Sequence, residues 1–241
     1  MDKKRNALLL KAVSVGEKDK ILTLLSLEEG LMTAKIKGVK NAGAKLKFAS
    51  EPFCFAEYVF SSTGDRNTVI SASLYDGFYP IRENFFAFYA GSVVLEFCRQ
   101  FCVEGEPFEG MLLLANETLS KLSYSDDDKM EVLVSFLLKA LSLTGYALKT
   151  DGCLSCEEDI EGRVFFESSS GGFLCLECVG ETGLEISRST YVVLKKIGNG
   201  EPLTEIENKD FYVKRALKLI DFYINDRTST TLKSLKDIIE L

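Results

Sequence analysis

Two pairs of cysteines constrain the fold of this chain more than any other feature. The pairs are Cys153/Cys156 and Cys175/Cys178, and eighteen residues separate them. Two intervening residues allow a tight turn to aim both sulfurs of a pair at one metal ion, and this spacing is typical of a four-thiolate zinc site. We therefore expect residues 151–180 to form a module that a structural Zn²⁺ ion orders, because four thiolates leave no open position for water or substrate.

Disulfide bonds and an iron–sulfur cluster are the alternatives for these four cysteines. Disulfides are disfavoured in a reducing cytosol, and the sequence shows no redox partner motif to accompany a cluster. A cytosolic location is expected because no charged segment followed by an apolar one opens the chain, and no apolar run approaches the ~20 residues of a bilayer span. We expect a soluble protein without a membrane partner.

The residues around the cysteines predict a hairpin and several helices. Segments 163–166 and 173–174 flank a polar, glycine-containing turn, which favours a hairpin that brings the two cysteine pairs together. Asp126 to Asp128, after Ser125, supply a helix N-cap and first-turn carboxylates; a metal site is the weaker interpretation of these acids. Helical periodicity predicts helices over residues 84–101, 111–122, 130–141, 189–197, 211–224 and 232–241. The first of these is apolar almost all round, as a buried helix would be.

The first third of the chain is typical of β-structure instead. Turn signals separate five short segments rich in β-branched and aromatic residues: 7–13, 20–27, 31–37, 53–61 and 68–75. In the third segment, alternation puts Thr33, Lys35 and Lys37 on one face and the apolar residues between them on the other. Five short strands favour a small barrel, which leaves no exposed sheet edge.

Charge is distributed unevenly along the chain. Residues 1–50 carry eleven Lys or Arg against five Asp or Glu, a net charge of +6, whereas the rest carries a net charge of −13. A basic first fifth on an acidic body is typical of an anion-binding module attached to a protein-interaction scaffold. The local field of this segment governs nucleic-acid binding more than the total of −7 does.

Lysines dominate the basic segment. Small five-stranded barrels commonly bind single strands along one face and its loops, so we expect these lysines to contact phosphates. The alternative is that they are only the solvent-exposed residues of a strand and a loop. Phe48, Phe53, Phe55 and Tyr58 lie nearby in sequence, but the sequence does not sort base-stacking rings from core rings. The expected DNA-contacting residues are Lys18, Lys20, Lys35, Lys37, Lys40, Lys45 and Lys47.

The absence of histidine excludes most hydrolytic machinery. Without imidazole there is no Ser/His/Asp triad, no Cys/His pair and no His-containing zinc hydrolase. A carboxylate and Mg²⁺ nuclease or nucleotidyl transferase is the enzymatic alternative, but no paired-carboxylate motif, P-loop or GxGxxG is present. We expect a protein that is not an enzyme.

Several motifs together resemble the RecO family of recombination mediators. They are Gly16-Glu17-Lys18-Asp19-Lys20, Gly30, Lys37-Gly38-Val39-Lys40, Lys45-Leu46, Glu51-Pro52-Phe53, the two cysteine pairs with Gly171-Gly172-Phe173-Leu174, and Leu232-Lys233-Ser234-Leu235. The resemblance spans nearly the whole chain. It departs from many relatives at Lys20, Val39 and Lys40, where arginine is common, and lysine lacks the planar fork of arginine for phosphate contact.

The resemblance implies an α+β chain, in which an OB-fold barrel precedes a helical domain with a zinc-binding insert. The corresponding domains are residues 1–80 (barrel), 81–150 and 181–241 (the two parts of the helical domain) and 151–180 (zinc module). It also implies a cytoplasmic, nucleoid-associated mediator without catalytic turnover. Such a mediator binds and anneals single-stranded DNA and helps to load RecA onto strands coated by single-strand-binding protein.

The implied partners are single- and double-stranded DNA, RecR, the C-terminal tail of single-strand-binding protein and, indirectly, RecA. The residues that would hold this tail and RecR are not assigned. A protein-interaction scaffold with a zinc module and no intrinsic DNA binding is the alternative function, because the acidic body could bind partners while the barrel merely docks.

Overall fold

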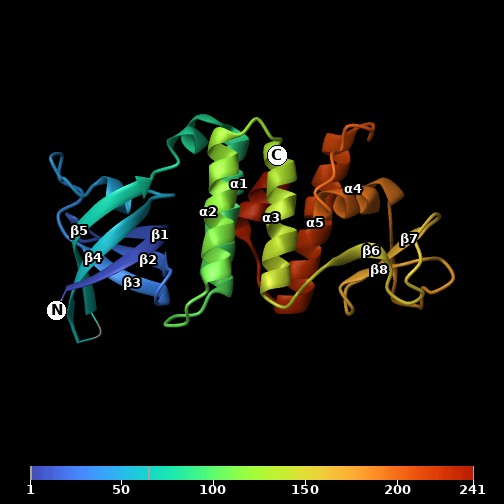
Figure 1. Ribbon diagram of the computed structural model, residues 1–241, viewed down its shortest axis with the longest axis horizontal. Coiled ribbons are helices and arrows are strands. Elements are labelled where there is room, and N and C mark those ends of the chain that lie inside the picture. The colour runs from blue at the N-terminus through green and yellow to red at the C-terminus, as the bar shows by residue number, and fades with distance from the viewer. Residues whose placement is uncertain (1, 65, 241) are drawn as a thin grey trace. The chain divides into compact units, whose positions relative to one another are not determined.

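The computed structural model describes residues 2–64 and 66–240 and divides the chain into two compact units, Met1–Asp126 and Asp127–Leu241. Each unit has its own strands and helices (Figure 1). This division is coarser than the four predicted domains, whose boundaries stay a prediction. None of the described helices is both long enough and apolar enough to cross a membrane.

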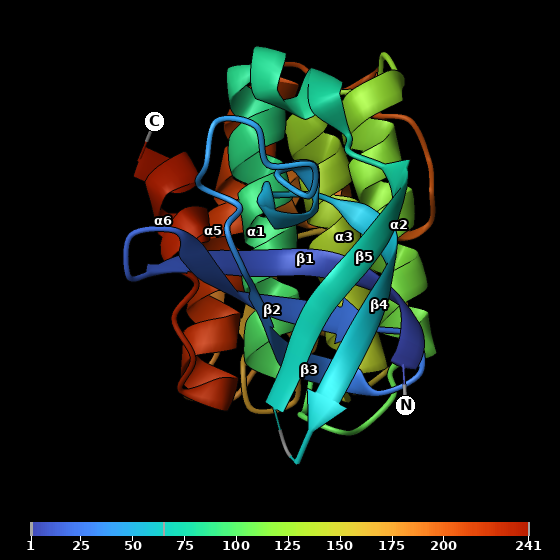
Figure 2. The same ribbon diagram turned by 90° about the vertical axis from the view of Figure 1, so that its left-hand side faces the viewer.

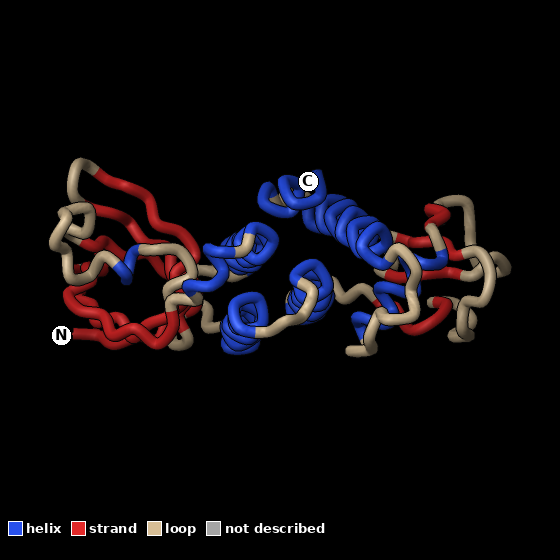
Figure 3. Tube along the Cα trace, turned by 90° about the horizontal axis from the view of Figure 1, so that it is seen from above, coloured by secondary structure: helices blue, strands red, loops and turns tan. Residues whose placement is uncertain are grey.

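Five strands close into a barrel in the first unit, with the order β1-β2-β3-β5-β4. All neighbouring strands are antiparallel except β3 and β5, which are parallel. Figure 2 looks onto these strands, and in Figure 3 they form a ring when seen from above. The strands are β1 (Asp2–Val15), β2 (Asp19–Ser26), β3 (Gly30–Ile36), β4 (Phe55–Thr63) and β5 (Arg66–Asp76). This order in a closed five-stranded barrel confirms the expected OB-fold.

Alternation along the strands builds the barrel core. In β3, Met32, Ala34 and Ile36 point into the core, and Thr33 and Lys35 between them point out, as predicted. The buried Tyr58 hydroxyl donates to the Ala49 carbonyl oxygen (3.0 Å) of the short helix η1 (Phe48–Ser50), which lies between β3 and β4. The loop that carries several of the predicted DNA lysines is therefore tied to the barrel core.

Two helices complete the first unit after the short helix η2 (Tyr79–Glu83): α1 (Phe85–Phe101) and α2 (Glu109–Tyr124). The Asn84 side chain caps α1 by accepting from the Ala87 N–H (2.9 Å). The middle of α1 is buried, but the prediction of burial all round is wrong for its first turn. Phe85 and Phe86 keep 53% and 48% of their surface exposed.

The second unit combines four helices with a four-stranded sheet. Asp128 caps the first helix by accepting from the N–H groups of Met130 and Glu131, which confirms the predicted cap. The helices are α3 (Lys129–Leu143), α4 (Arg188–Gly198), α5 (Lys209–Thr228) and α6 (Lys233–Glu240). The sheet has the order β6-β8-β7-β9, with β6 (Lys149–Cys153), β7 (Val164–Glu167), β8 (Gly172–Leu174) and β9 (Leu184–Ile186). The antiparallel pair β7 and β8 confirms the predicted hairpin.

Candidate functional site

The four predicted metal ligands lie at one edge of the second-unit sheet. Strands β6 and β8 are parallel neighbours, with Cys153 opposite Phe173. The first cysteine pair begins at the last residue of β6, and the second pair begins directly after β8. Because parallel strands end at the same edge of a sheet, two pairs that are distant in sequence meet there. The hairpin was predictable, but the parallel partner β6 was not, because Lys149–Cys153 is short and has no alternating pattern.

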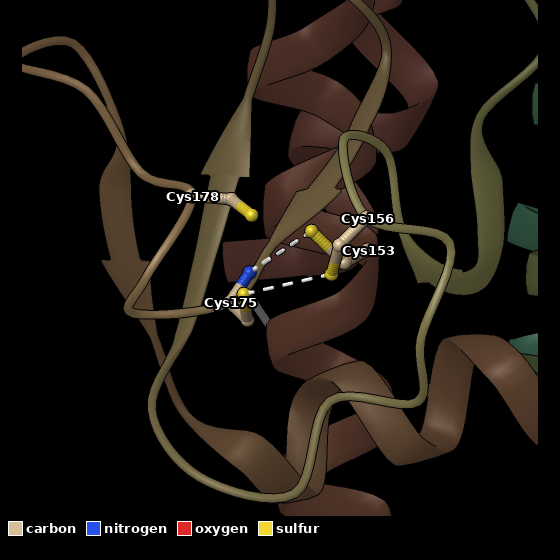
Figure 4. Close-up of side chains that lie close together, drawn as sticks. All are labelled: Cys153, Cys156, Cys175 and Cys178. Carbon is tan, nitrogen blue, oxygen red and sulfur yellow. Dashed lines mark hydrogen bonds between the residues drawn. The ribbon is translucent and has the colours of Figure 1, made fainter.

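The four sulfurs converge on one point (Figure 4), and all lie within 4.8 Å of one another. The sulfurs of Cys156 and Cys175 are 3.9 Å apart, far longer than the bond of about 2.05 Å in a disulfide. A tetrahedron of sulfurs at about 2.3 Å from a central zinc has edges of about 3.8 Å. The observed spacing fits such a tetrahedron, and the cluster could hold a metal ion.

Backbone groups favour the thiolate form of Cys153. Burial raises the pKa of this thiol, but hydrogen bonds from the N–H groups of Cys156, Cys175 and Ser155 outweigh it and lower the pKa to about 6. The Cys175 N–H lies 3.4 Å from the Cys153 sulfur. Cys153 is therefore ionised near neutral pH, and the thiolate is the form that binds metal.

The turn around the first cysteine pair depends on a glycine. Gly152 has a φ of +97°, and a Cβ atom there would lie 2.8 Å from the Glu158 carbonyl oxygen. This close approach lets the Cys153 N–H donate to the same carbonyl oxygen (2.9 Å), which folds the chain back after the pair. Glycine is required here because it has neither a Cβ atom nor a penalty for positive φ.

The predicted DNA lysines lie in the first unit, on and around strands β2 and β3. Lys35 is on the outer face of β3, opposite Ile21 of β2, and its ammonium pairs with Asp19 at 2.8 Å. Lys37 directly follows β3 and is exposed. The outer face of β2 and β3 thus carries lysines beside the exposed aliphatic side chain of Ile21.

The turn between β1 and β2 adjoins the loop that follows β3. The Lys40 N–H donates to the Lys18 carbonyl oxygen (3.2 Å), and the Gly38 N–H donates to Asp19 Oδ1 (3.0 Å). Lys18 and Lys40, both exposed, are therefore neighbours although 22 positions separate them in the sequence. These contacts bring four of the predicted residues together around Asp19: Lys18, Lys35, Lys37 and Lys40.

Lys20 occupies a different position. By alternation, Lys20 lies on the same face of β2 as the buried Leu22. Its ammonium donates to the Ser50 carbonyl oxygen (3.1 Å) and approaches Ser50 Oγ (3.3 Å). Lys47 lies next to this contact, because its carbonyl oxygen accepts from Ser50 Oγ (2.9 Å). Lys45, two positions before Lys47 in the same loop, is exposed.

The other basic cluster near the start of the chain is neutralised. Lys4 pairs with Glu57 of β4 at 3.1 Å, and Arg5 pairs with Glu29. These residues belong to β1, which begins at Asp2, earlier than the predicted strand over 7–13. In this cluster Lys4 and Arg5 each have a carboxylate partner, whereas in the cluster around Asp19 one carboxylate pairs with Lys35 and lies among four lysines.

The structure sorts the aromatic residues that the sequence left open. Phe53 and Tyr58 are buried, whereas Phe48 and Phe55 are partly buried. The more exposed rings of this unit are those of Tyr75, Tyr79, Tyr124, Phe85, Phe86 and Phe88. Phe85, Phe86 and Phe88 lie in the segment that the sequence predicts to be a buried helix. The sequence signal nearest to them is the polar N-cap Asn84, which marks the start of α1.

Comparison with known proteins covers both units. A family model described as "Recombination protein O N terminal" matches residues 1–78, and one described as "Recombination protein O C terminal" matches residues 82–236. Curated relatives from several bacteria carry the name "DNA repair protein RecO". That of Pelotomaculum thermopropionicum is 31% identical, with 84% of this chain and 79% of the relative covered. Those of Acetivibrio thermocellus (27%; 81% of each chain) and Desulforamulus reducens (28%; 95% and 92%) are similar over comparable lengths.

Proposed function

Since the chain belongs to the RecO family, we propose that it is a DNA repair and recombination mediator that binds single-stranded DNA on the outer face of β2 and β3 and anneals complementary strands. The observation that carries this proposal is the cluster of Lys18, Lys35, Lys37 and Lys40 at the junction of the β1–β2 turn and the loop after β3. In OB-folds, this face and this turn bind oligonucleotides.

The proposed chemistry needs no catalytic group. Ammonium groups neutralise phosphates and release counterions, which lowers the repulsion between two strands. Lysines that contact the backbone leave the base edges free to pair, so a surface of this kind can promote annealing. Lys47 and Lys45 would extend the contact along the loop, and Lys20 would add charge beside Ser50.

We further propose that the cysteine cluster holds a structural Zn²⁺ ion. Support comes from the donor set, since four thiolates with this spacing suit zinc and leave no open coordination position. The ion would connect the ends of β6 and β8. The second unit would then serve as a frame on which RecR and the tail of single-strand-binding protein dock, with RecA loading as the outcome.

Binding of a fluorescent oligo-dT strand, measured by anisotropy, tests the DNA proposal. The triple variant Lys35→Gln/Lys37→Gln/Lys40→Gln should weaken binding at least tenfold, because each phosphate contact contributes to the counterion-release term. A matched control removes three exposed lysines of the second unit, Lys139→Gln/Lys149→Gln/Lys218→Gln, with the same change in net charge. Equal losses in the two variants would contradict a site on β2 and β3.

Absence of any strand binding by the wild-type protein would favour the protein-interaction scaffold. The observation that favours the scaffold is the net charge of −13 beyond residue 50. An annealing assay with two complementary oligonucleotides, run beside the binding assay, separates the two functions. Acceleration by wild type but not by the Lys35/Lys37/Lys40 variant supports the mediator.

A further inference from the structure

Asp19 lies at the centre of the lysine cluster, where a nucleic-acid phosphate would be expected. Its Oδ2 atom is 2.8 Å from the Lys35 ammonium, and its Oδ1 atom accepts the Gly38 N–H at 3.0 Å. The side chain retains 26% of its surface exposed, so it is held at the protein surface. One carboxylate therefore occupies two of the donors that face outward from β2 and β3.

The donors around Asp19 are those that proteins use to hold phosphate oxygens. A backbone N–H in a turn with positive φ and nearby ammonium groups form an anion-binding concavity. Gly38 has a φ of +69°. The hydrogen bond from Lys35 and then that from Gly38 lower the pKa of the Asp19 carboxyl, and Lys37 adds to this effect through its charge. The cradle therefore already holds an anion when DNA is absent.

We propose that Gly38 N–H, Lys35 and Lys37 form a phosphate subsite and that Asp19 occupies it as an internal placeholder, which a phosphate of single-stranded DNA displaces. This inference rests on the proposed function and identifies a residue that limits affinity. A carboxylate and a phosphate cannot share the Lys35 ammonium without mutual repulsion. Asp19 therefore weakens DNA binding at this point and makes the contact reversible.

Asp19→Asn is the variant that tests the placeholder. Asparagine has the same shape, and its Oδ1 can still accept from Gly38, but the charge that competes for Lys35 is gone. We expect oligo-dT binding to tighten about fivefold, in line with the loss of one exposed charge contact. We also expect the slope of log K against log[salt] to steepen by about 0.7, which corresponds to one more phosphate contact.

Glu17→Gln provides the matched control. Glu17 is exposed in the same turn, two positions from Asp19, and the substitution changes the net charge by the same amount. It should change affinity less than twofold and leave the salt slope unaltered, since screening weakens a charge that is not in contact. If Glu17→Gln tightens binding as much as Asp19→Asn does, general charge explains the gain and the placeholder is wrong.

A double-variant cycle completes the test. Asp19→Asn should tighten binding in the wild-type background but not in the Lys35→Met background, because the freed ammonium is then missing. Asp19→Ser, which also removes the charge, should reproduce the gain and covers the case in which the asparagine variant does not fold. Weaker binding by a folded Asp19→Asn or Asp19→Ser protein overturns the inference, because it would make Asp19 a support that orients Lys35. These outcomes leave the proposed function standing, whereas a wild-type protein that binds no oligo-dT would contradict the proposed function itself.

Discussion

The Lys20 ammonium lies 3.1 Å from the Ser50 carbonyl oxygen and connects the start of β2 to the short helix η1. Lys37, one strand away, is exposed instead. The two residues look equivalent in the sequence, since both are lysines near the start or end of a predicted strand. They differ in what their charge contacts, and this difference leads to distinct expectations for stability.

Lys20→Met should lower the free energy of unfolding of the first unit by about 1 kcal/mol, because a buried carbonyl oxygen loses its donor. Lys37→Met should leave stability within about 0.5 kcal/mol of wild type, as is usual for exposed positions. Urea unfolding monitored by circular dichroism measures both. Equal stability of the two variants would show that the contact with Ser50 contributes nothing to the fold.

Gly30→Ala should destabilise the first unit strongly. Gly30 has a φ of +67°, and a Cβ atom there would lie 1.9 Å from the Glu106 carbonyl oxygen, in the loop between α1 and α2. Backbone must move to relieve this overlap, so we expect a loss of about 3 kcal/mol in thermal or urea unfolding.

Gly16→Ala is the control for that substitution. Gly16 has a similar φ of +65°, but nothing lies within 4 Å of the position of its Cβ. Only the conformational penalty of about 1 kcal/mol should apply. If both variants lose the same free energy of unfolding, the close approach of Glu106 to Gly30 contributes nothing to the destabilisation.

Removal of the metal should unfold the module that carries the cysteines. We expect one Zn²⁺ per chain by elemental analysis, and loss of amide protection in residues 151–180 after chelation, because the ion would connect the two cysteine pairs at the ends of the short strands β6 and β8. Cys156→Ser should lower the metal content, whereas Ser155→Ala, a change between the same two ligands, should not. Full protection of the module in metal-free protein would contradict a structural ion.

Metal binding should depend on pH in a defined direction. Cys153, with a pKa of about 6, is already a thiolate at pH 7, whereas Cys175, with a pKa of about 12, still carries its proton. Zinc binding to the metal-free protein at pH 7 should therefore release fewer than four protons, and affinity should fall as pH decreases. Calorimetry in buffers of different ionisation enthalpy counts the protons, and a release of four would contradict an ionised Cys153.

The sequence predicts elements better than it predicts neighbours. Alternation and turn residues identify the five barrel strands, and the spacing of the cysteines identifies the ligand set. The pairing of β6 with β8 is not predictable in this way, because Lys149–Cys153 is stabilised by its partner strand and not by its own pattern. The exposure of Phe85 has a similar cause, since an apolar residue in a helix does not reveal whether another element covers it.

The roles of individual lysines depend on tertiary structure for the same reason. Alternation correctly places Lys35 on the outer face of β3, but no local signal shows that Asp19 holds it. The distance between these residues is set by the register of β2 and β3, in which Lys20 lies opposite Ile36. A count of positive charges therefore overstates the number of lysine ammonium groups that are free to contact DNA.

The salt dependence of oligo-dT binding by the wild-type protein tests the central claim most directly. If about five lysines of the β2–β3 face and its loops contact phosphates, log K should fall linearly with log[salt] with a slope of about −3 to −4. A slope near zero, or no binding even at low salt, would contradict the assignment of this surface to single-stranded DNA.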